Sequence, residues 1–324
     1  MILVQTPLRI SFVGGGTDFK DYYIRRDGSV ISAAIDQYVY VMVKKRFDDA
    51  IRVVYSKTEV ADSVDEIQHD LVREALRKTG VEKGVEIATF ADIPSEGCGL
   101  GSSSAITIGL LNALYTYVGT RKNPEQLAQE ACDIEIDVLK RPIGKQDQYI
   151  VAYGGIRHLI FRANDTVEVN SVDLVATSLK LLEERLLLLY TGMTRKSTEI
   201  LTEQKQNMSV HFAMLDQMNS LVPQLKESLL NGVGVQFGRL LDKNWRLKKQ
   251  LASKISNSDI DNYYERTLRA GAIGGKICGA GGGGFLLLYC PPEKRDAVKE
   301  AARPMREMKF RFERRGSTVL LDGQ

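Results

Sequence analysis

A glycine- and serine-rich segment has the composition of a loop that binds an anion. Residues 94–105 have the sequence PSEGCGLGSSSA and lie between a predicted strand and a predicted apolar helix. Glycine lets the backbone approach a ligand closely. The first amides of a helix lack acceptors inside the helix and lie at the positive end of its dipole. The residues that we expect to hold phosphate groups are Gly97, Gly99, Leu100, Gly101, Ser102, Ser103 and Ser104.

This segment differs from the commonest phosphate loop, and both its role and its metal ligands stay open. It is not a Walker loop, because no Gly-Lys-Ser/Thr follows the glycines. An ordinary glycine-rich turn, in which Ser102 only caps the helix, is the alternative. Serine hydroxyls in such a loop can also ligate Mg²⁺, and Ser103 is our candidate for that role.

A carboxylate further along the chain is predicted to face inward. The helix expected over 124–140 begins with Asn123 as N-cap, Pro124 at the first position and Gln126 three residues after the cap. Glu135 falls at the edge of the apolar stripe of this helix. A buried acid must be neutral, paired or bound to a cation. Nucleotide-bound Mg²⁺ would satisfy it, and an ion pair with an arginine is the alternative.

Three segments, in order along the chain, resemble the motifs of the GHMP kinase superfamily, to which galactokinase, homoserine kinase and mevalonate kinase belong. The loop at 94–105 resembles the phosphate-binding motif of that family. Residues 6–19 (TPLRISFVGGGTDF) resemble its N-terminal motif, and residues 276–289 (KICGAGGGGFLLLY) resemble its C-terminal glycine motif. The resemblance implies an ATP-dependent small-molecule kinase that uses Mg²⁺.

The resemblance also implies a fold with two α+β domains. The first would be of the ribosomal-protein type and bind the nucleotide, and the second would be a ferredoxin-like α+β domain. The polar stretch 165–177 is the best candidate joint. We therefore predict one domain over 1–170 and another over 171–324.

The resemblance assigns roles to residues of two short segments. Asp147, in GKQDQ, would lie beside the acceptor hydroxyl and take its proton, with Lys145 adding positive charge, while an ordinary turn residue is the alternative for Asp147. Arg9 would lie near the transferred phosphate, and Asp18 would bind a sugar hydroxyl. Glu135, with Ser103, would ligate Mg²⁺.

Further substrate contacts are expected from glycines and from one basic segment. Gly16 and Thr17 lie beside Asp18 in the GGGTD turn, and Gly281 and Gly282 belong to the last glycine cluster, whose alternative role is that of a hinge. A substrate that already carries a phosphate needs a cation, and Arg195 is our candidate. Lys196 lies beside it, and Lys145 and Arg157 are held in reserve.

The GGGTD turn and the GKQDQ segment resemble one branch of the family, that of heptose 7-phosphate kinases and the fucokinase domain. The resemblance implies phosphorylation of the anomeric hydroxyl of D-glycero-D-manno-heptose 7-phosphate to the 1,7-bisphosphate. Another sugar 1-kinase, of the fucokinase or octose type, is one alternative. A sugar-binding regulator without catalysis is a second, and an isoprenoid-pathway kinase fits the fold but not these motifs.

Hydrophobic periodicity and turn residues predict the elements that must position these side chains. Strands are expected over 3–13, 30–44, 84–93, 149–161, 185–190, 285–290 and a final pair near 308–321. Helices are expected over 64–79, 105–118, 124–140, 195–206, 209–230, 234–252, 259–271 and 293–305, with a glycine loop over 274–284.

The composition of the 324 residues excludes several classes of protein. A formal net charge of +3 is too small to indicate a nucleic-acid partner. The apolar runs are too short for a membrane span, and the N-terminus lacks the pattern of a signal peptide. Four cysteines without metal-ligand spacing indicate reduced, mostly buried thiols in a cytoplasmic protein. The oligomeric state is open, and a homodimer is one option.

Overall fold

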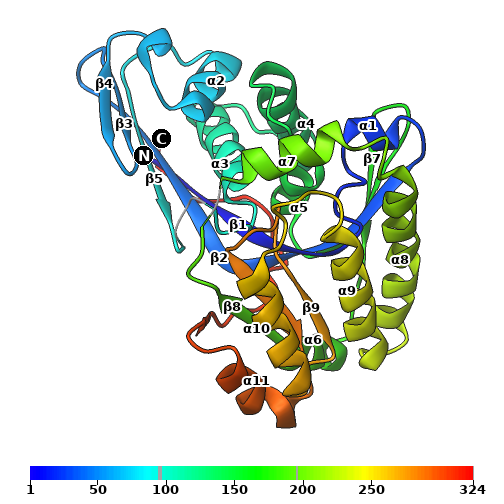
Figure 1. Cartoon of the computed structure of the whole chain (residues 1–324). Helices are drawn as coiled ribbons and strands as arrows, with labels where there is room; N and C mark the ends of the chain where they lie inside the picture. Colours follow the sequence, from blue (N-terminus) through cyan, green and yellow to red (C-terminus); the bar gives the residue numbers. More distant parts are fainter. Residues whose placement is uncertain (94–96, 195, 324) are drawn as a thin grey trace.

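The elements of the protein gather around two β-sheets (Figure 1). The computed structural model describes residues 1–93, 97–194 and 196–323. The larger sheet contains β1 (Ile2–Val13), β2 (Gly28–Lys45), β3 (Ile51–Val54), β4 (Thr58–Ala61), β5 (Val85–Ala91), β6 (Ile156–Phe161), β7 (Val167–Ser171) and β12 (Thr318–Asp322). The smaller sheet contains β8 (Leu186–Tyr190), β9 (Gly274–Ile277), β10 (Phe285–Tyr289) and β11 (Arg306–Glu307).

The helices lie on the faces of these sheets. Those of the first half are α1 (Lys20–Tyr23), the 3₁₀ turn η1 (Val64–Glu66), α2 (Asp70–Thr79), α3 (Ser102–Tyr117), α4 (Pro124–Cys132), the π-helical segment η2 (Asp133–Val138) and α5 (Gln146–Tyr153). Those of the second half are α6 (Ala176–Arg185), α7 (Ser197–Gln206), α8 (Phe212–Leu230), α9 (Val235–Lys248), α10 (Ser258–Arg269), the 3₁₀ turn η3 (Pro292–Lys294) and α11 (Arg295–Ala301).

The long strand β2 organises the larger sheet. The order is β12-β1-β2-β5-β3-β4, and β6 and β7 extend the sheet beyond the N-terminal half of β2. One edge of β2 pairs with β1 along most of its length, while the other edge is shared between β6 and β5. The helix α3 packs against β1 and β2. The central strand β1, with Arg9 and Ser11, is therefore held from both sides and from one face.

Strands β8 and β10 are buried on both faces, which explains their leucine-rich sequences. Leu188 and Leu287 belong to the main core with β1, β2 and α3, whereas Leu189 and Leu288 face a second core with α10 and α11. The smaller sheet has the order β11-β8-β10-β9. Alternate side chains of a strand point to opposite faces, so a strand covered on both sides loses its polar positions. The smaller sheet thus joins the two cores.

The fold confirms the expected α+β class with two sheet systems and corrects three expectations about elements. The strand region predicted over 149–161 begins with helix, since α5 continues to Tyr153 and only β6 is extended. The loop predicted over 274–284 begins with β9, which pairs with β10. The two strands expected near 308–321 do not pair, because β11 joins the smaller sheet and β12 pairs with β1.

The boundary at 170/171 stays a prediction. The larger sheet takes its strands from residues up to Ser171 and then receives β12 from the end of the chain. The two termini lie side by side (Figure 1), and the Met1 amino group donates to the Gly323 carbonyl at 3.1 Å. The four cysteines are buried and free, as expected. Within the described ranges, no helix combines the length and hydrophobicity of a membrane span.

Candidate active site

A cavity of about 1290 Å³ brings together segments that are far apart in the sequence. Its walls come from β1, the turn after β1, the glycine-serine loop, η2, the start of α5, α7 and the glycine loop after β9. The two glycine loops touch each other, because a Cβ added at Gly99 would lie 2.5 Å from the Cys278 carbonyl oxygen. Only a residue without a side chain permits this approach.

The predicted phosphate loop lines this cavity. Gly97, Gly99, Gly101, Ser102, Ser103 and Ser104 are among the lining residues. The helix α3 begins at Ser102, directly after Gly101 in a left-handed conformation with φ of 77°. The side chain of Leu100 is fully buried, and its carbonyl accepts a hydrogen bond from the Arg9 amide at 2.9 Å. The N-terminus of α3 is thus open to the cavity, while the loop is fixed to β1 from behind.

Arg9 and Asp147 form an ion pair with two hydrogen bonds on the cavity wall. Arg9 Nε donates to Asp147 Oδ1 at 2.7 Å, and Nη2 donates to Oδ2 at 2.5 Å. The remaining Nη1 donates to the Gly99 carbonyl at 2.6 Å. The Arg9 side chain is 5% exposed and that of Asp147 is 24% exposed. One guanidinium therefore connects the phosphate loop to the candidate catalytic aspartate, whose oxygens keep lone pairs for an acceptor hydroxyl.

Asp18 is a second carboxylate on this wall, and it is held in a different way. Its Oδ1 accepts from the Gly16 amide at 2.9 Å, and its Oδ2 accepts from the Gln146 amide at 3.3 Å. Burial raises the pKa of Asp18, and the two amides oppose that shift. Gly16 lines the cavity beside Asp18. Thr17 is fully buried, and its hydroxyl donates to the Gly14 and Ser29 carbonyls, which fixes the turn.

Two predicted basic contacts point elsewhere. The Lys145 ammonium donates to Asp165 Oδ1 at 2.6 Å and lies over the Tyr23 ring. Arg157 donates to the Gly154 carbonyl at 2.7 Å. Neither is among the described residues that line the cavity, whereas Lys196 is. Arg195 lies outside the described residues.

Glu135 is buried beside the phosphate loop, as the helix pattern predicts. It has no exposed surface, and burial raises its pKa to about 7. Its Oε2 accepts from the Ser104 hydroxyl at 3.2 Å, while Oε1 has no hydrogen-bond partner among the described residues. Arg141 Nη1 donates to the Ser103 hydroxyl at 2.5 Å and lies 3.9 Å from Glu135 Oε2. The arginine that the alternative interpretation required is therefore present.

These residues fit Mg²⁺ that arrives with a nucleotide. Mg²⁺ is usually held by one or two protein carboxylates together with phosphate oxygens and water. Glu135 supplies a carboxylate with an unpaired oxygen, and the Ser103 hydroxyl, which is bonded to the same Arg141 that approaches Glu135, would supply a second oxygen. The described residues contain no cluster of three histidine, cysteine or acidic side chains that would bind a metal without a nucleotide.

The C-terminal glycine loop forms the part of the cavity wall that adjoins the phosphate loop. Gly279, Gly281 and Gly283 line the cavity. The amide of Gly282 donates to the Ile255 carbonyl at 2.8 Å, which fixes the loop to the second half of the chain. The glycines here therefore provide both close contact with the phosphate loop and a fixed position.

The structure adds cavity residues that the sequence did not indicate. They are Ser11, Asp70, Arg141, Gln146, Gln204, Lys248 and Lys276. Ser11, Gln146 and Lys276 stand inside segments that resemble family motifs, so their place in a motif was the signal available. Asp70, Arg141, Gln204 and Lys248 are polar residues outside those segments, and nothing in the local sequence separates them from solvent-exposed ones.

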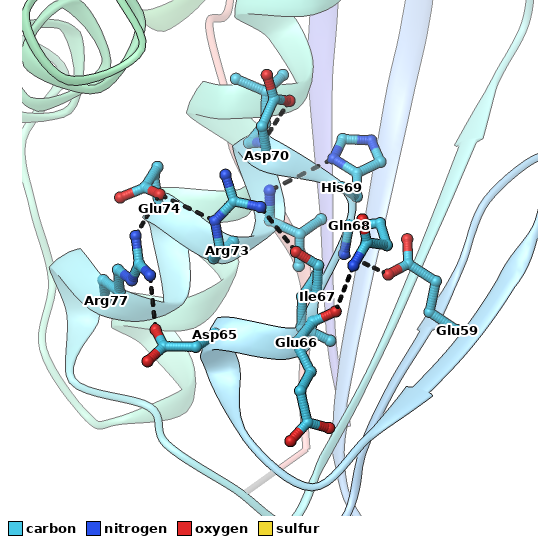
Figure 2. Close-up of polar contacts among 12 residues, drawn as sticks. Glu59, Asp65, Glu66, Ile67, Gln68, His69, Asp70, Arg73, Glu74 and Arg77 are labelled. Atoms are coloured by element: carbon cyan, nitrogen blue, oxygen red, sulfur yellow. Dashed lines mark hydrogen bonds and ion pairs between the residues drawn. The ribbon is translucent and has the colours of Figure 1, made fainter.

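Polar contacts fix the start of α2, which forms a further wall of the cavity (Figure 2). Arg73 donates to the Ile67 carbonyl at 2.7 Å, across the turn that precedes α2. His69 is the N-cap of α2, and its Nδ1 accepts from the Val72 amide at 3.4 Å. Asp70 then accepts two hydrogen bonds from Arg141. The position of Arg141 beside Ser103 and Glu135 is thus set by the start of α2.

Comparison with known families decides the class of the protein. The family model described as "GHMP kinases N terminal domain" matches residues 67–155, and the model described as "GHMP kinases C terminal" matches residues 225–308. The two matches together cover more than half of the chain. The chain belongs to the GHMP kinase family. It is therefore a phosphotransferase that acts on an alcohol group, and GHMP kinases use ATP as the phosphate donor.

Individual relatives and solved structures match most of this chain. The chain is 29% identical to a D-glycero-alpha-D-manno-heptose 7-phosphate kinase of Campylobacter jejuni, over 93% of each protein. It is 27% identical to a bifunctional fucokinase/GDP-fucose pyrophosphorylase of Arabidopsis thaliana, over 88% of this chain and 29% of that protein. A crystal structure of a D-glycero-D-manno-heptose 1-phosphate kinase from Bacteroides thetaiotaomicron superposes with a TM-score of 0.83, at 24% identity and 99% coverage of both chains. This last match shows the fold.

Proposed function

We propose that this GHMP kinase transfers the terminal phosphoryl group of ATP to the anomeric hydroxyl of D-glycero-D-manno-heptose 7-phosphate and forms the 1,7-bisphosphate. The observation that carries the proposal is the 29% identity, over 93% of both proteins, with a kinase named for that substrate. The Asp147–Arg9 pair beside the phosphate loop supplies the geometry that a sugar kinase needs. The coarser function, a sugar kinase of this family, has the broader support.

In this proposal, Asp147 orients the acceptor and receives its proton. A bond forms between the sugar oxygen and the terminal phosphorus, the bond from that phosphorus to the bridging oxygen breaks, and ADP leaves. Transfer of this kind depends on position and charge neutralisation more than on covalent chemistry. Arg9 holds both oxygens of Asp147 and the Gly99 carbonyl, so it fixes the distance between acceptor and phosphates. Asp18 accepts a hydrogen bond from a further hydroxyl of the sugar.

The nucleotide would lie along α3 and the wall formed by α2. The amides that begin α3 face the phosphates, and Glu135 with Ser103 would hold Mg²⁺. Mg²⁺ supplies charge neutralisation between the terminal phosphates of the nucleotide. We place the base against Tyr55, Phe90 and Ile93, which line the same cavity as the phosphate loop. Phe90 is 56% exposed, as expected for a ring that a planar ligand covers.

The phosphate already present on the substrate needs a cation near the cavity mouth. Lys196 is exposed and lines the cavity just before α7, so we place the substrate phosphate there. A neutral sugar would not use this contact. The effect of Lys196→Met on turnover therefore separates a sugar phosphate from a free sugar.

Release of ADP, measured with purified protein and a panel of acceptors, tests the proposal. The panel contains heptose 7-phosphate, mannose, fucose, galactose and mevalonate with Mg-ATP, and phosphorus NMR identifies the product. Turnover on heptose 7-phosphate alone supports the proposal. We expect Asp147→Asn to lower kcat by about 10²–10⁴-fold, the usual contribution of a general base. Asp137→Asn, at an exposed position of η2, is the matched control.

The similarity to fucokinases supports a second candidate, a kinase for a neutral sugar. Turnover on fucose or mannose but not on heptose 7-phosphate would replace the first proposal with the second. A regulator without catalysis requires that no acceptor is phosphorylated while the sugar still binds. In that case Asp147→Asn would change neither binding of ATP nor release of ADP.

A further inference from the structure

Two lysines from the second half of the chain are buried in the wall of the active-site cavity. Lys248, at the end of α9, is 6% exposed, and Lys276, in β9, is 1% exposed. Both line the cavity together with Arg9 and Asp147. Neither has an assigned role in the mechanism described so far. They bring two positive charges into a site whose Arg9 is already neutralised by Asp147.

The hydrogen bonds of these lysines are too few to account for their burial. Lys276 Nζ donates to the Ser11 carbonyl at 2.7 Å, and Lys248 Nζ donates to the Gly279 carbonyl at 2.5 Å. In the described part of the chain, neither ammonium makes another hydrogen bond or an ion pair with a carboxylate within 4.0 Å. An ammonium has three donors, and a buried charge without a counter-ion is strongly unfavourable. Methionine would fill the same space without that penalty.

The surroundings of the pair point to a ligand with negative charge. The hydroxyl of Ser11 is buried in the same wall and has no partner among the described residues. Burial lowers the pKa of Lys248 to about 8 and that of Lys276 well below its usual value. Each is lowered further by a neighbouring cation, Arg9 for Lys248 and Lys248 for Lys276. An anion between these cations would remove both the repulsion and part of the burial penalty.

The position of the pair identifies which phosphoryl group this anion belongs to. Lys248 is bonded to Gly279, and a Cβ added at Gly279 would lie 2.6 Å from the Gly99 Cα atom of the phosphate loop. Arg9 reaches both Gly99 and Asp147. Lys248 thus lies at the contact of the two glycine loops, and Lys276 is bonded to Ser11 on the same strand as Arg9. This is the part of the cavity wall where we place the group that moves from nucleotide to acceptor.

We propose that Lys248 and Lys276, together with Arg9, form the binding site for the phosphoryl group in transfer. The inference rests on the phosphoryl transfer of the proposed function, but not on the identity of the sugar. While the bond to the bridging oxygen breaks and the bond to the sugar oxygen forms, negative charge is spread over the three other oxygens of the group. Fixed cations in a site that excludes water stabilise that charge. A phosphate already carried by the acceptor is the other source of the same chemistry.

Binding of two nucleotides separates the two sources. The probes are the ATP analogue AMP-PNP, which keeps a terminal phosphoryl group, and ADP, both with Mg²⁺ and measured by calorimetry. We expect Lys248→Met and Lys276→Met to weaken AMP-PNP binding at least about tenfold and ADP binding less than about twofold, because only AMP-PNP carries the terminal phosphoryl group that the lost cation would contact. Lys249→Met is the matched control, since Lys249 pairs with Asp261 and is not among the described residues of the cavity wall.

Steady-state kinetics give the second readout. We expect each methionine variant to lower kcat by about 10²–10³-fold with little change in the KM of the acceptor, and arginine at the same position to restore part of kcat. Thermal unfolding must show that the variants fold, which is expected because a buried charge is removed. A raised KM for the sugar phosphate with unchanged kcat would assign the pair to the acceptor phosphate and overturn the proposal. Unchanged nucleotide binding and kinetics would overturn it in favour of a packing role.

Failure of the proposed function can be recognised separately. If no sugar in the panel is phosphorylated, the proposed substrate is wrong. The difference between AMP-PNP and ADP still decides whether the lysines bind the terminal phosphoryl group.

Discussion

At the scale of single residues, the two carboxylates of the cavity wall that we propose as acceptor contacts are held in different ways. Both oxygens of Asp147 receive hydrogen bonds from Arg9, so the carboxylate is paired with a cation. Among the described residues Asp18 forms no ion pair and is held by two backbone amides, and burial raises its pKa. Neighbouring acids in different environments are a common way to separate roles in a site. Asp147 is therefore suited to the reacting hydroxyl and Asp18 to a hydroxyl that only binds.

Replacement of Glu135 by glutamine tests the metal site at this scale. Glutamine keeps the shape and can accept from Ser104, but it removes the charge that a cation requires. We expect the affinity for Mn²⁺ in the presence of ADP, followed by electron paramagnetic resonance, to fall at least about tenfold. The melting temperature should stay equal or rise, because a buried acid is removed. Glu130→Gln, in the preceding turn of α4, is the control; a metal affinity unchanged by Glu135→Gln would contradict the assignment.

Replacement of two cavity glycines by alanine should affect stability differently. A Cβ at Gly99 would lie 2.5 Å from the Cys278 carbonyl oxygen at a φ of +78°, so Gly99→Ala should destabilise the protein by more than about 1–2 kcal/mol. A Cβ at Gly15 meets nothing closer than Gln146 Nε2 at 3.7 Å. Gly15→Ala should therefore leave the melting temperature unchanged and narrow the acceptor pocket. We expect a raised KM for the sugar and an unchanged KM for ATP, and a sugar KM like that of the wild type would show that no substrate group lies there.

At the scale of elements, the helix that carries Glu135 shows how local structure serves the site. Its first part, α4, begins with a complete capping box, in which Asn123 accepts from the Gln126 amide and Gln126 accepts from the Asn123 amide. It then widens into the π-helical segment η2, from which the Glu135 side chain enters the wall of the cavity. A π-helical turn is rare and less favourable than an α-helical one, and it is frequent at functional sites. The helix thus begins with a stabilising cap and ends in an irregular π-helical segment that carries Glu135.

Removal of the cap measures how much the start of this helix contributes to the stability of the protein. Asn123→Ala removes the acceptor for the Gln126 amide, and we expect the free energy of unfolding to fall by about 1 kcal/mol. The effect on kcat should be small, since the cap lies at the far end of the helix from Glu135. Chemical denaturation and kinetics on the same preparation check both. Asn207→Ala, at the end of α7, is a comparison without a side-chain cap, and a loss of activity larger than the loss of stability would show that α4 also sets the position of Glu135.

The elements also show what the sequence could and could not predict. The capping box, the inward Glu135 and the phosphate loop follow from local patterns, and the structure confirms the first two directly. The strand β9 was missed because its glycines indicated a loop, but Gly274 is required by packing, since a Cβ there would lie 2.0 Å from the Gly238 carbonyl of α9. The start of α5 was missed because Tyr149 and Ile150 favour strands and burial overrides that preference. Such contacts between distant segments leave no local pattern.

At the scale of the whole molecule, the active site is closed by contacts between sequence-distant segments. β12 pairs with β1 and joins the end of the chain to its beginning. Lys276 of the smaller sheet donates to Ser11 of the larger one, and the two glycine loops touch at Gly99 and Cys278. Each cavity wall thus depends on the mutual position of the two sheets. Catalysis and global stability should therefore be lost together when the sheets separate.

At this scale, one buried histidine, His158, should make the stability of the protein depend on pH. His158 lies in β6, and its Nδ1 is buried without a partner among the described residues. Burial, with Lys226 nearby, lowers its pKa from 6.5 to about 4, while Glu168 opposes the shift. The unfolded chain therefore binds one more proton than the folded protein between these values. The stability that neutral His158 permits is complete above pH 6.5 and is lost as the pH falls towards 4.

Replacement of His158 by glutamine should remove this loss. We expect the free energy of unfolding of His158→Gln, relative to the wild type, to rise by roughly 2–3 kcal/mol between pH 7 and pH 4, because one pKa unit corresponds to about 1.36 kcal/mol. Urea denaturation at several pH values measures the difference, and carboxylates that titrate in the same range cancel in it. A difference between His158→Gln and the wild type that stays constant with pH would show that His158 takes up its proton at the same pH in the folded and unfolded states and would contradict this prediction.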